Sequence, residues 1–120
     1  MKNSLVLAYL GDSVFELYIR EYVISIRDFK VNDLQKIVTS IVSAKGQVKI
    51  LNSLTENNIL TDDEISVVNN GRNHKTNSHP KNTDIITYKY ATGFEALIGY
   101  LYLEKNKKRI EEIIKYILED

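Results

Sequence analysis

The sequence predicts an all-α fold that forms a single domain over residues 1–120. Apolar residues recur at helical rather than alternating spacing along most of the chain, and no segment shows the pattern of a strand. A chain of 120 residues is long enough for one real core and too short for two. Its content of 43% hydrophobic and 27% charged residues is that of a globular protein.

Two helices are expected in the first half of the chain. The first runs from Ser4 to about Ile24, where apolar and tyrosine residues recur every three or four positions. Asn32 can cap the second, whose apolar stripe continues to about Leu51 with an expected break near Gly46. This half is therefore predicted to be helical almost throughout.

The middle of the chain combines a short helix with a long loop. Thr61 followed by Glu64 has the spacing of a capping box, which predicts a third helix from Asp62 to about Asn70. The stretch from Gly71 to Thr83 holds the only proline and almost no apolar residue, so we expect a loop there. Loops of this length are usually functional or disordered.

The last third predicts the core helix and a closing helix. From Asp84 to Leu103 the run is almost continuously apolar and aromatic, which indicates a helix buried on most sides. From Lys107 to Asp120, isoleucine and leucine share one face and charged residues the other, as in an amphipathic surface helix. The tyrosines on these helices are expected to serve the core and interfaces.

Composition excludes several classes of protein. Without cysteine there can be no disulfide framework and no thiolate metal site, and we expect a cytoplasmic protein. No apolar run suits a signal peptide or a membrane span. The net charge is zero, yet residues 71–89 carry four basic residues against one acidic residue, a local charge of +3 that suits a phosphate partner.

Two carboxylates stand in apolar surroundings. Asp12 interrupts the most apolar part of the first helix, and Glu95 lies between apolar residues of the core helix. A buried carboxylate without a partner is costly, so something must compensate both. A divalent metal ion is one candidate, and a salt bridge to Lys45 or Arg20 is the other.

Glycines accompany both acids. Gly11 adjoins Asp12, and Gly93 precedes Glu95 by two residues, although glycine weakens a helix interior. Missing side chains at these positions indicate either close helix packing or room for a ligand.

The run LAYLGDSVFELYIRE, from Leu7 to Glu21, resembles the signature helix of ribonuclease III. Three further blocks are similar to the conserved blocks of the mini-ribonuclease III branch, which lacks a double-stranded-RNA-binding domain: VSAKGQ at residues 42–47, GRNHKTNSHPKN at residues 71–82 and YATGFEALIGYLYL at residues 90–103. The blocks stand in the right order and cover most of the chain. The resemblance implies a ribonuclease III endonuclease-domain-like helical bundle.

Carried over position by position, the resemblance makes Asp12 the catalytic aspartate and Glu95 the metal-binding glutamate, both holding Mg²⁺, for which Mn²⁺ can substitute. Larger ribonuclease III enzymes carry further carboxylates where this chain has Ala8 and Thr92, and the mini branch lacks them too. Fewer carboxylates leave more water around the ion, as Mg²⁺ tolerates. Asn70 stands at an expected arginine, which weakens the predicted RNA affinity.

The residues expected to contact RNA lie in the basic segment, residues 71–89, and are Arg72, Asn73, Lys75 and Lys81. Such side chains suit the phosphates and 2′-hydroxyls of A-form RNA, although a solvated surface loop is the alternative. His74 and His79 lie in the same segment without other metal ligands, so a histidine metal site is not expected.

Two further side chains are candidates for supporting roles. Glu16 follows Asp12 by one helical turn, where it either orients water or is simply solvated, and solvation is favoured. Lys45 is the lysine expected nearest the site, with its charged end buried.

These features together predict a metal-dependent endoribonuclease that cleaves double-stranded RNA as a homodimer and takes no small-molecule substrate. The resemblance implies maturation of the large-subunit (23S) ribosomal RNA precursor. Tyr9, Leu10 and Phe15 are expected to supply the dimer surface. The alternatives are a catalytically inactive ribonuclease III-like module that binds RNA structurally and a helical protein-interaction module.

Overall fold

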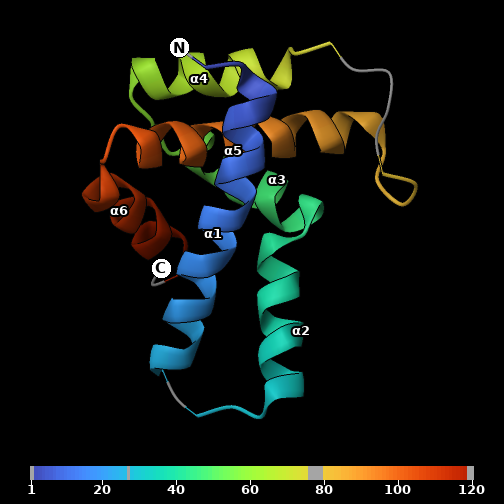
Figure 1. The fold of residues 1–120 in the computed structure, drawn as a ribbon, viewed down its shortest axis with the longest axis vertical. Coiled ribbons are helices and arrows are strands. Elements are labelled where there is room, and N and C mark those ends of the chain that lie inside the picture. Colours follow the sequence, from blue (N-terminus) through green and yellow to red (C-terminus); the bar gives the residue numbers. More distant parts are fainter. Residues whose placement is uncertain (1, 27, 76–79, 119–120) are drawn as a thin grey trace.

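A computed structural model describes residues 2–26, 28–75 and 80–118 of the chain. Over these residues it contains six helices and no strand, which confirms the predicted all-α class (Figure 1). The helices are α1 (Ser4–Ile26), α2 (Val31–Val42), α3 (Ala44–Glu56), α4 (Asp62–Arg72), α5 (Ile85–Leu103) and α6 (Lys107–Leu118).

Helix α5 is the central element, as its apolar sequence predicts. It contacts α1, α3, α4 and α6, and nine of its residues between Ala91 and Leu101 are buried. Figure 1 shows α1 crossing it. Asp84 caps α5 from outside, since its side chain accepts a hydrogen bond from the backbone N–H of Thr87 at 2.9 Å.

Glycines allow α1 and α5 to approach each other backbone to backbone. A Cβ atom added at Gly11 would lie 1.7 Å from the carbonyl oxygen of Glu95, and one added at Gly99 would lie 2.0 Å from that of Leu7. No side chain fits at either position. Gly93, the glycine near Glu95, is packed in the same way against α4, since a Cβ there would lie 2.7 Å from the carbonyl oxygen of Val68. For both glycines beside the acids, the structure thus supports close helix packing.

Phe15 of α1 and Phe94 of α5 anchor this contact. Both are fully buried, and their rings meet edge to face with centroids 5.0 Å apart. The prediction that Phe15 belongs to an exposed dimer surface is therefore wrong. Phe15 lies on the same side of α1 as Leu7, Gly11 and Val14, which face the core.

The predicted helix boundaries agree with the structure in part. The capping box of α4 is present, because Thr61 and Glu64 exchange hydrogen bonds between side chain and backbone. The expected cap at Asn32 is wrong, since α2 already begins at Val31 after an extended Lys30. The break predicted near Gly46 occurs at Ser43, whose hydroxyl caps α3.

A buried ion pair fastens α6 to the start of α4. Arg109 donates to both carboxylate oxygens of Glu64, at 2.7 and 2.8 Å, and to the carbonyl oxygen of Ile59 at 2.8 Å. Glu64 is only 4% exposed. The bidentate pair and the bond to Ile59 therefore join α6 to a stretch of chain at least 45 positions earlier.

Nothing in the described ranges suggests a bilayer crossing: none of their helices is both long and apolar enough to span a membrane.

Candidate active site

The crossing of α1 and α5 brings Asp12 and Glu95 together. Gly11 lies against the backbone of Glu95, so the next residue of α1, Asp12, faces the Glu95 side chain. The two carboxyl groups are close enough to hydrogen-bond and to interact electrostatically. Two acids that are 83 positions apart in sequence thus form one acidic pair.

The two members of the acidic pair differ in exposure. Glu95 is half-buried, in keeping with its apolar neighbours, whereas Asp12 is exposed. The expectation of a buried Asp12 is wrong because the buried stripe of α1 passes through Gly11 and Phe15, and Asp12 lies at its edge. The Asp12 carboxylate therefore faces solvent, and the Glu95 carboxylate approaches Asp12 from the protein interior.

The surroundings of Glu95 disfavour its charged form. Burial, followed by the hydrogen bond and the negative charge of Asp12, raises its pKa from 4.5 to about 8, and the amide of Gln47 only partly offsets this. Among the described residues no salt bridge to Glu95 is present: Arg20 pairs with Glu16, and Lys45 is exposed. Neither cation proposed from the sequence compensates the acidic pair.

Gln47 is a member of the site that the sequence did not reveal. It projects from α3, is 2% exposed, and donates through Nε2 to Glu95 Oε2 at 3.3 Å and to the carbonyl oxygen of Val42 at 2.9 Å. One signal could have found it. Gln47 occupies the position that precedes Ile50, Leu51 and Leu54 at helical spacing, so it is a polar residue within an apolar stripe.

The donor set suits a hard divalent cation. Asp12 and Glu95 offer carboxylate oxygens, the ligands that such ions prefer. Gln47 takes part through Nε2, which contacts Glu95, while its buried Oε1 has no hydrogen-bond partner. The described ranges hold no cluster of three or more histidine, cysteine, aspartate or glutamate side chains with metal-binding geometry. Water and substrate oxygens would complete the coordination, which is ordinary for Mg²⁺.

Asp12 opens onto a shallow hollow on the outer side of α1. The hollow measures about 450 Å³ and is lined by Asp12, Ser13, Glu16, Leu17 and Arg20. Glu16 is engaged by Arg20, one turn further along α1, which favours the solvated ion-pair role over water orientation. Lys45 lines a different hollow, beside the start of α5, and its end is not buried.

The basic segment begins on a helix. Arg72 belongs to the last turn of α4, and its guanidinium lies over the ring of Tyr90, 5.4 Å from the centroid. Asn73 follows as the C-cap, and Lys75 and Lys81 are exposed.

Of the two histidines, His74 has its Nδ1 3.0 Å from the carbonyl oxygen of Lys75. His79 lies outside the described residues.

Comparison with known proteins assigns this arrangement to a family. Residues 5–106 match the model of the Ribonuclease III domain. The chain belongs to the ribonuclease III family. It is 42% identical to the Mini-ribonuclease 3 of Enterococcus faecalis, over 98% of this chain and 89% of that protein. Identity to the Mini-ribonuclease 3 of Brevibacillus brevis is 46%, over 96% and 84%.

A solved structure agrees. The crystal structure of protein FN1578 from Fusobacterium nucleatum superposes with a TM-score of 0.85 and 33% identity, covering 98% of this chain and 92% of that one. The resemblance seen in the sequence blocks is thus confirmed, and this ribonuclease III domain is an endoribonuclease.

Ala8 and Thr92 stand where the resemblance implies further carboxylates in larger ribonuclease III enzymes, and both residues are buried. The hydroxyl of Thr92 donates to the carbonyl oxygen of Tyr88 within α5, so it is already engaged. The acidic pair is therefore supported here by an amide, Gln47, and by helix packing.

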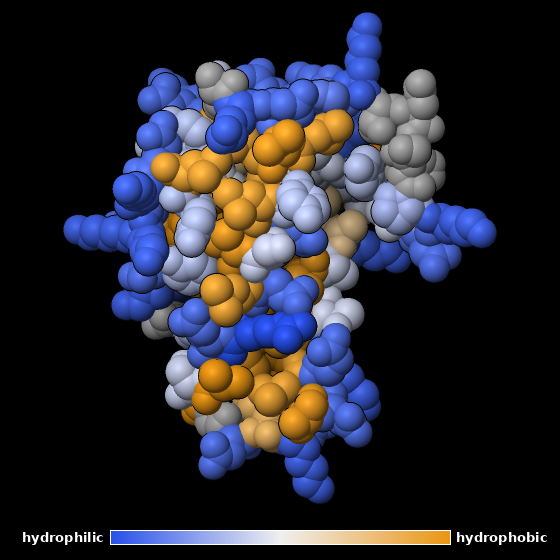
Figure 2. Space-filling model, in the orientation of Figure 1, coloured by the Kyte–Doolittle hydropathy of each residue, from blue (hydrophilic) through white to orange (hydrophobic). Residues whose placement is uncertain are grey.

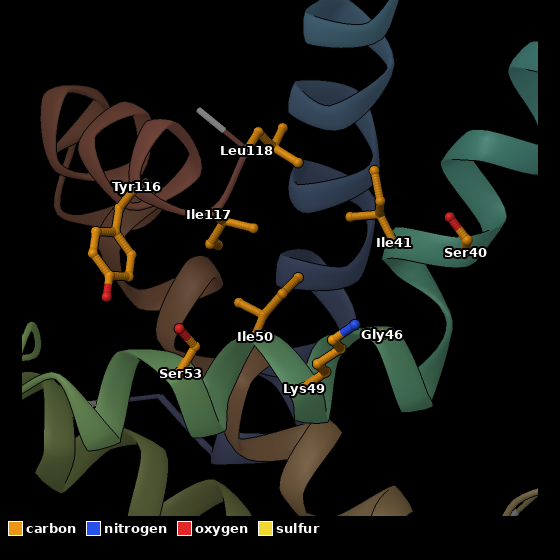
Figure 3. A pocket seen from close by; sticks show the side chains of 9 residues that line it. All are labelled: Ser40, Ile41, Gly46, Lys49, Ile50, Ser53, Tyr116, Ile117 and Leu118. Atoms are coloured by element: carbon orange, nitrogen blue, oxygen red, sulfur yellow. The ribbon is translucent and has the colours of Figure 1, made fainter. Parts of the chain in front are cut away.

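A more apolar hollow of about 450 Å³ lies between α6 and the junction of α2 and α3 (Figure 3). Ile41, Ile50 and Ile117 project into it, and Lys49 lies at its edge. Neither Asp12 nor Glu95 lines it. Size therefore does not distinguish this hollow from the one at Asp12, and the acidic pair lies at the latter.

Proposed function

We propose that this endoribonuclease cleaves double-stranded RNA with Mg²⁺ bound by Asp12 and Glu95, and that Mn²⁺ can replace Mg²⁺. The observation that carries the proposal is the acidic pair: burial and the neighbouring Asp12 together raise the pKa of Glu95, and a bound cation would offset both effects. When bound, the ion supplies positive charge beside the scissile phosphate and an activated water.

The protein's own part in the reaction is to bind and orient. Exposed Asp12 presents its carboxylate to solvent, and half-buried Glu95 holds a second carboxylate behind it. The rigid crossing at Gly11 and Gly99 fixes the distance between their helices. A site assembled from helices in direct backbone contact keeps its ligands in place without a moving loop.

The basic segment is the proposed RNA contact. Exposed Asn73, Lys75 and Lys81 offer donors to phosphates and 2′-hydroxyls, and Arg72 is held beside them on Tyr90. Replacing Arg72, Lys75 and Lys81 by alanine is expected to weaken RNA binding and lower the salt slope by about one unit per lost phosphate contact. Binding is measured by fluorescence anisotropy at several salt concentrations. An unchanged slope means that the segment does not touch phosphate.

A homodimer is proposed because one acidic pair can reach only one strand of a duplex. Helix α1 exposes apolar side chains along its length: Tyr9 is 83% exposed, Leu17 56% and Ile24 61%. Figure 2 shows hydrophobic side chains gathered over the course of α1. Such a patch, flanked by polar residues, suits a two-fold contact in which each subunit faces one strand. Large-subunit ribosomal RNA precursor is the proposed substrate, from the relation to mini-ribonuclease III.

Incubation with a labelled RNA duplex, with Mg²⁺ or with EDTA, tests the function. Cleavage in Mg²⁺ alone, at paired positions on both strands, is the expected result. Native and denaturing gels of a mixed dimer of wild-type and Asp12→Asn subunits should show nicks in place of double-strand breaks. Duplex binding without cleavage would indicate an inactive RNA-binding module. The absence of both binding and cleavage would refute the proposal.

A further inference from the structure

Gln47 differs from the other buried polar residues of the described ranges. Glu64 and Thr92 use their side-chain oxygens in hydrogen bonds, whereas Gln47 Oε1 is buried and has no partner. Elsewhere in the described part of the chain, no side-chain nitrogen or oxygen buried to this degree lacks a partner. A half-satisfied amide in a core reduces stability, so stability does not explain why a glutamine occupies this position.

The orientation of the amide follows from its contacts. Nε2 faces two acceptors, the carbonyl oxygen of Val42 at 2.9 Å and Glu95 Oε2 at 3.3 Å, and so uses both of its hydrogens. Turning the amide over would set Oε1 against two other oxygens. The unpaired Oε1 is thus the direct consequence of holding Glu95.

The chain is shaped locally to bring Gln47 to Glu95. Helix α2 ends at Val42, Ser43 caps α3, and Gly46 lets the two helix ends come close. A Cβ atom at Gly46 would lie 2.4 Å from the carbonyl oxygen of Ile41. The next residue is Gln47, and Val42 at the same junction supplies its second acceptor. Two helices and their junction therefore fix the position of one amide.

We propose that Gln47 is a positioning residue of the active site, which holds the Glu95 carboxylate in the orientation that binds the divalent cation. The inference rests on the proposed function, because it assumes that Glu95 is a ligand. A neutral amide is suited to this task. It restrains one carboxylate oxygen without supplying a positive charge that would compete with the cation, as a lysine or arginine would.

Gln47→Met tests the proposal, since methionine keeps the length and burial and removes both the donor and the unpaired oxygen. Mn²⁺ binding to the RNA-free protein is measured by calorimetry, and thermal unfolding is followed in EDTA. We expect Mn²⁺ affinity to fall about tenfold or more, with an unfolding temperature equal to or above that of wild type. Gln47→Leu is the second variant, in case methionine packs poorly.

Two controls distinguish a role of Gln47 in cation binding from a general effect of substitution on packing. Gln35→Met makes the same change on an exposed glutamine of α2, which contacts Thr39, and should change neither quantity. Val67→Ala removes buried volume on α4 and should lower stability without lowering Mn²⁺ affinity. Wild-type Mn²⁺ affinity in both Gln47 variants would overturn the proposal, as would a loss that Val67→Ala reproduces.

The proposed function has its own readout in the same experiment. If wild type binds Mn²⁺ saturably and Asp12→Asn does not, the acidic pair is the cation site, and the Gln47 variants then decide the inference alone. If wild type and Asp12→Asn give the same Mn²⁺ isotherm, the proposed function fails and the role of Gln47 fails with it.

Discussion

Glu64 and Glu95 both lie in or at the edge of the core, but one faces a positively charged partner and the other a negatively charged one. Burial raises the pKa of both. At Glu64, hydrogen bonds from Arg109 and Thr61 and the charge of Arg109 outweigh burial, and the net pKa is lowered. At Glu95 the nearest charged group is another carboxylate, Asp12, and the pKa rises to about 8.

The two glutamates therefore serve different ends, one structural and one chemical. The Glu64 pair is complete within the protein, since both carboxylate oxygens and the guanidinium have partners. The acidic pair of Asp12 and Glu95 is incomplete, because it has no positively charged partner among the described residues. A carboxylate that needs something from outside the chain is a candidate for function, whereas a satisfied one is a candidate for stability.

The largest expected effect separates the two glutamates by activity. Asp12→Asn and Glu95→Gln should each reduce cleavage at saturating RNA and Mg²⁺ about a thousandfold or more, because each removes a proposed cation ligand. Glu64→Gln should keep turnover within about threefold, well below its unfolding temperature. Initial rates on an end-labelled duplex, with circular dichroism as the check of folding, measure both. Equal losses at Glu64 and Glu95 would erase the distinction.

The next effect concerns stability and compares the buried Glu64–Arg109 pair with an exposed ion pair. Arg109→Met strands Glu64 as a buried charge and should lower the free energy of unfolding by about 3 kcal/mol, with cleavage unchanged. Arg20→Met is the matched control. It breaks the exposed pair with Glu16, whose side chains are 55% and 38% exposed, and should cost less than about 1 kcal/mol. Urea unfolding measures both, and similar losses would show that burial of the Glu64 pair is immaterial.

The pH dependence of stability should have opposite signs in the two regions. Because the pKa of Glu95 rises from 4.5 to about 8 on folding, the folded protein holds more protons between these values, and stability falls as pH rises through that window. The lowered pKa of Glu64 gives stability that is present above 4.5 and is lost as pH falls through its folded-state pKa.

Metal-free wild type should therefore lose roughly 2 kcal/mol between mildly acidic and mildly alkaline pH. This is less than the full shift would give, because Glu95 is only half-buried and solvent screens part of the effect. Glu95→Gln should remove the decline, and Mg²⁺ should suppress it in wild type. Thermal unfolding at a series of pH values in EDTA tests this. A decline that survives in Glu95→Gln would assign it to another group.

The sequence predicted the helices and the acidic pair because both depend on periodicity and local chemistry. The capping box at Thr61 and the apolar run of α5 act within one helix, so their outcome could be read from spacing alone. Asp12 and Glu95 were found because a carboxylate in an apolar run is anomalous wherever the chain folds.

What the sequence could not predict depends on how helices are rotated and paired. Phe15 and Asp12 are three positions apart, yet one is fully buried and the other is exposed, because the contact with α5 decides which side of α1 faces inward. Arg109 gave no sign of pairing with Glu64, 45 positions earlier. Gln47 was likewise overlooked, since its role appears only once α3 lies beside Glu95.

The smallest expected effect tests whether the Glu64 region is one unit. Thr61→Ala removes the hydroxyl that accepts from the Glu64 backbone N–H at 3.2 Å and should cost about 1 kcal/mol. Asp84→Ala, at the matching N-cap of α5, should cost a similar amount. The two caps differ in what they touch, because only Thr61 shares Glu64 with Arg109.

Combining each cap variant with Arg109→Met makes that difference measurable. Thr61→Ala with Arg109→Met should depart from additivity by about 0.5 kcal/mol or more, since both changes act on the same carboxylate. Asp84→Ala with Arg109→Met should be additive within that limit, because no residue connects them directly. Urea unfolding of wild type, the three single variants and the two double variants gives both coupling energies. Additivity in both cycles would mean that the capping box and the ion pair stabilise the protein independently, and that Glu64 merely takes part in each.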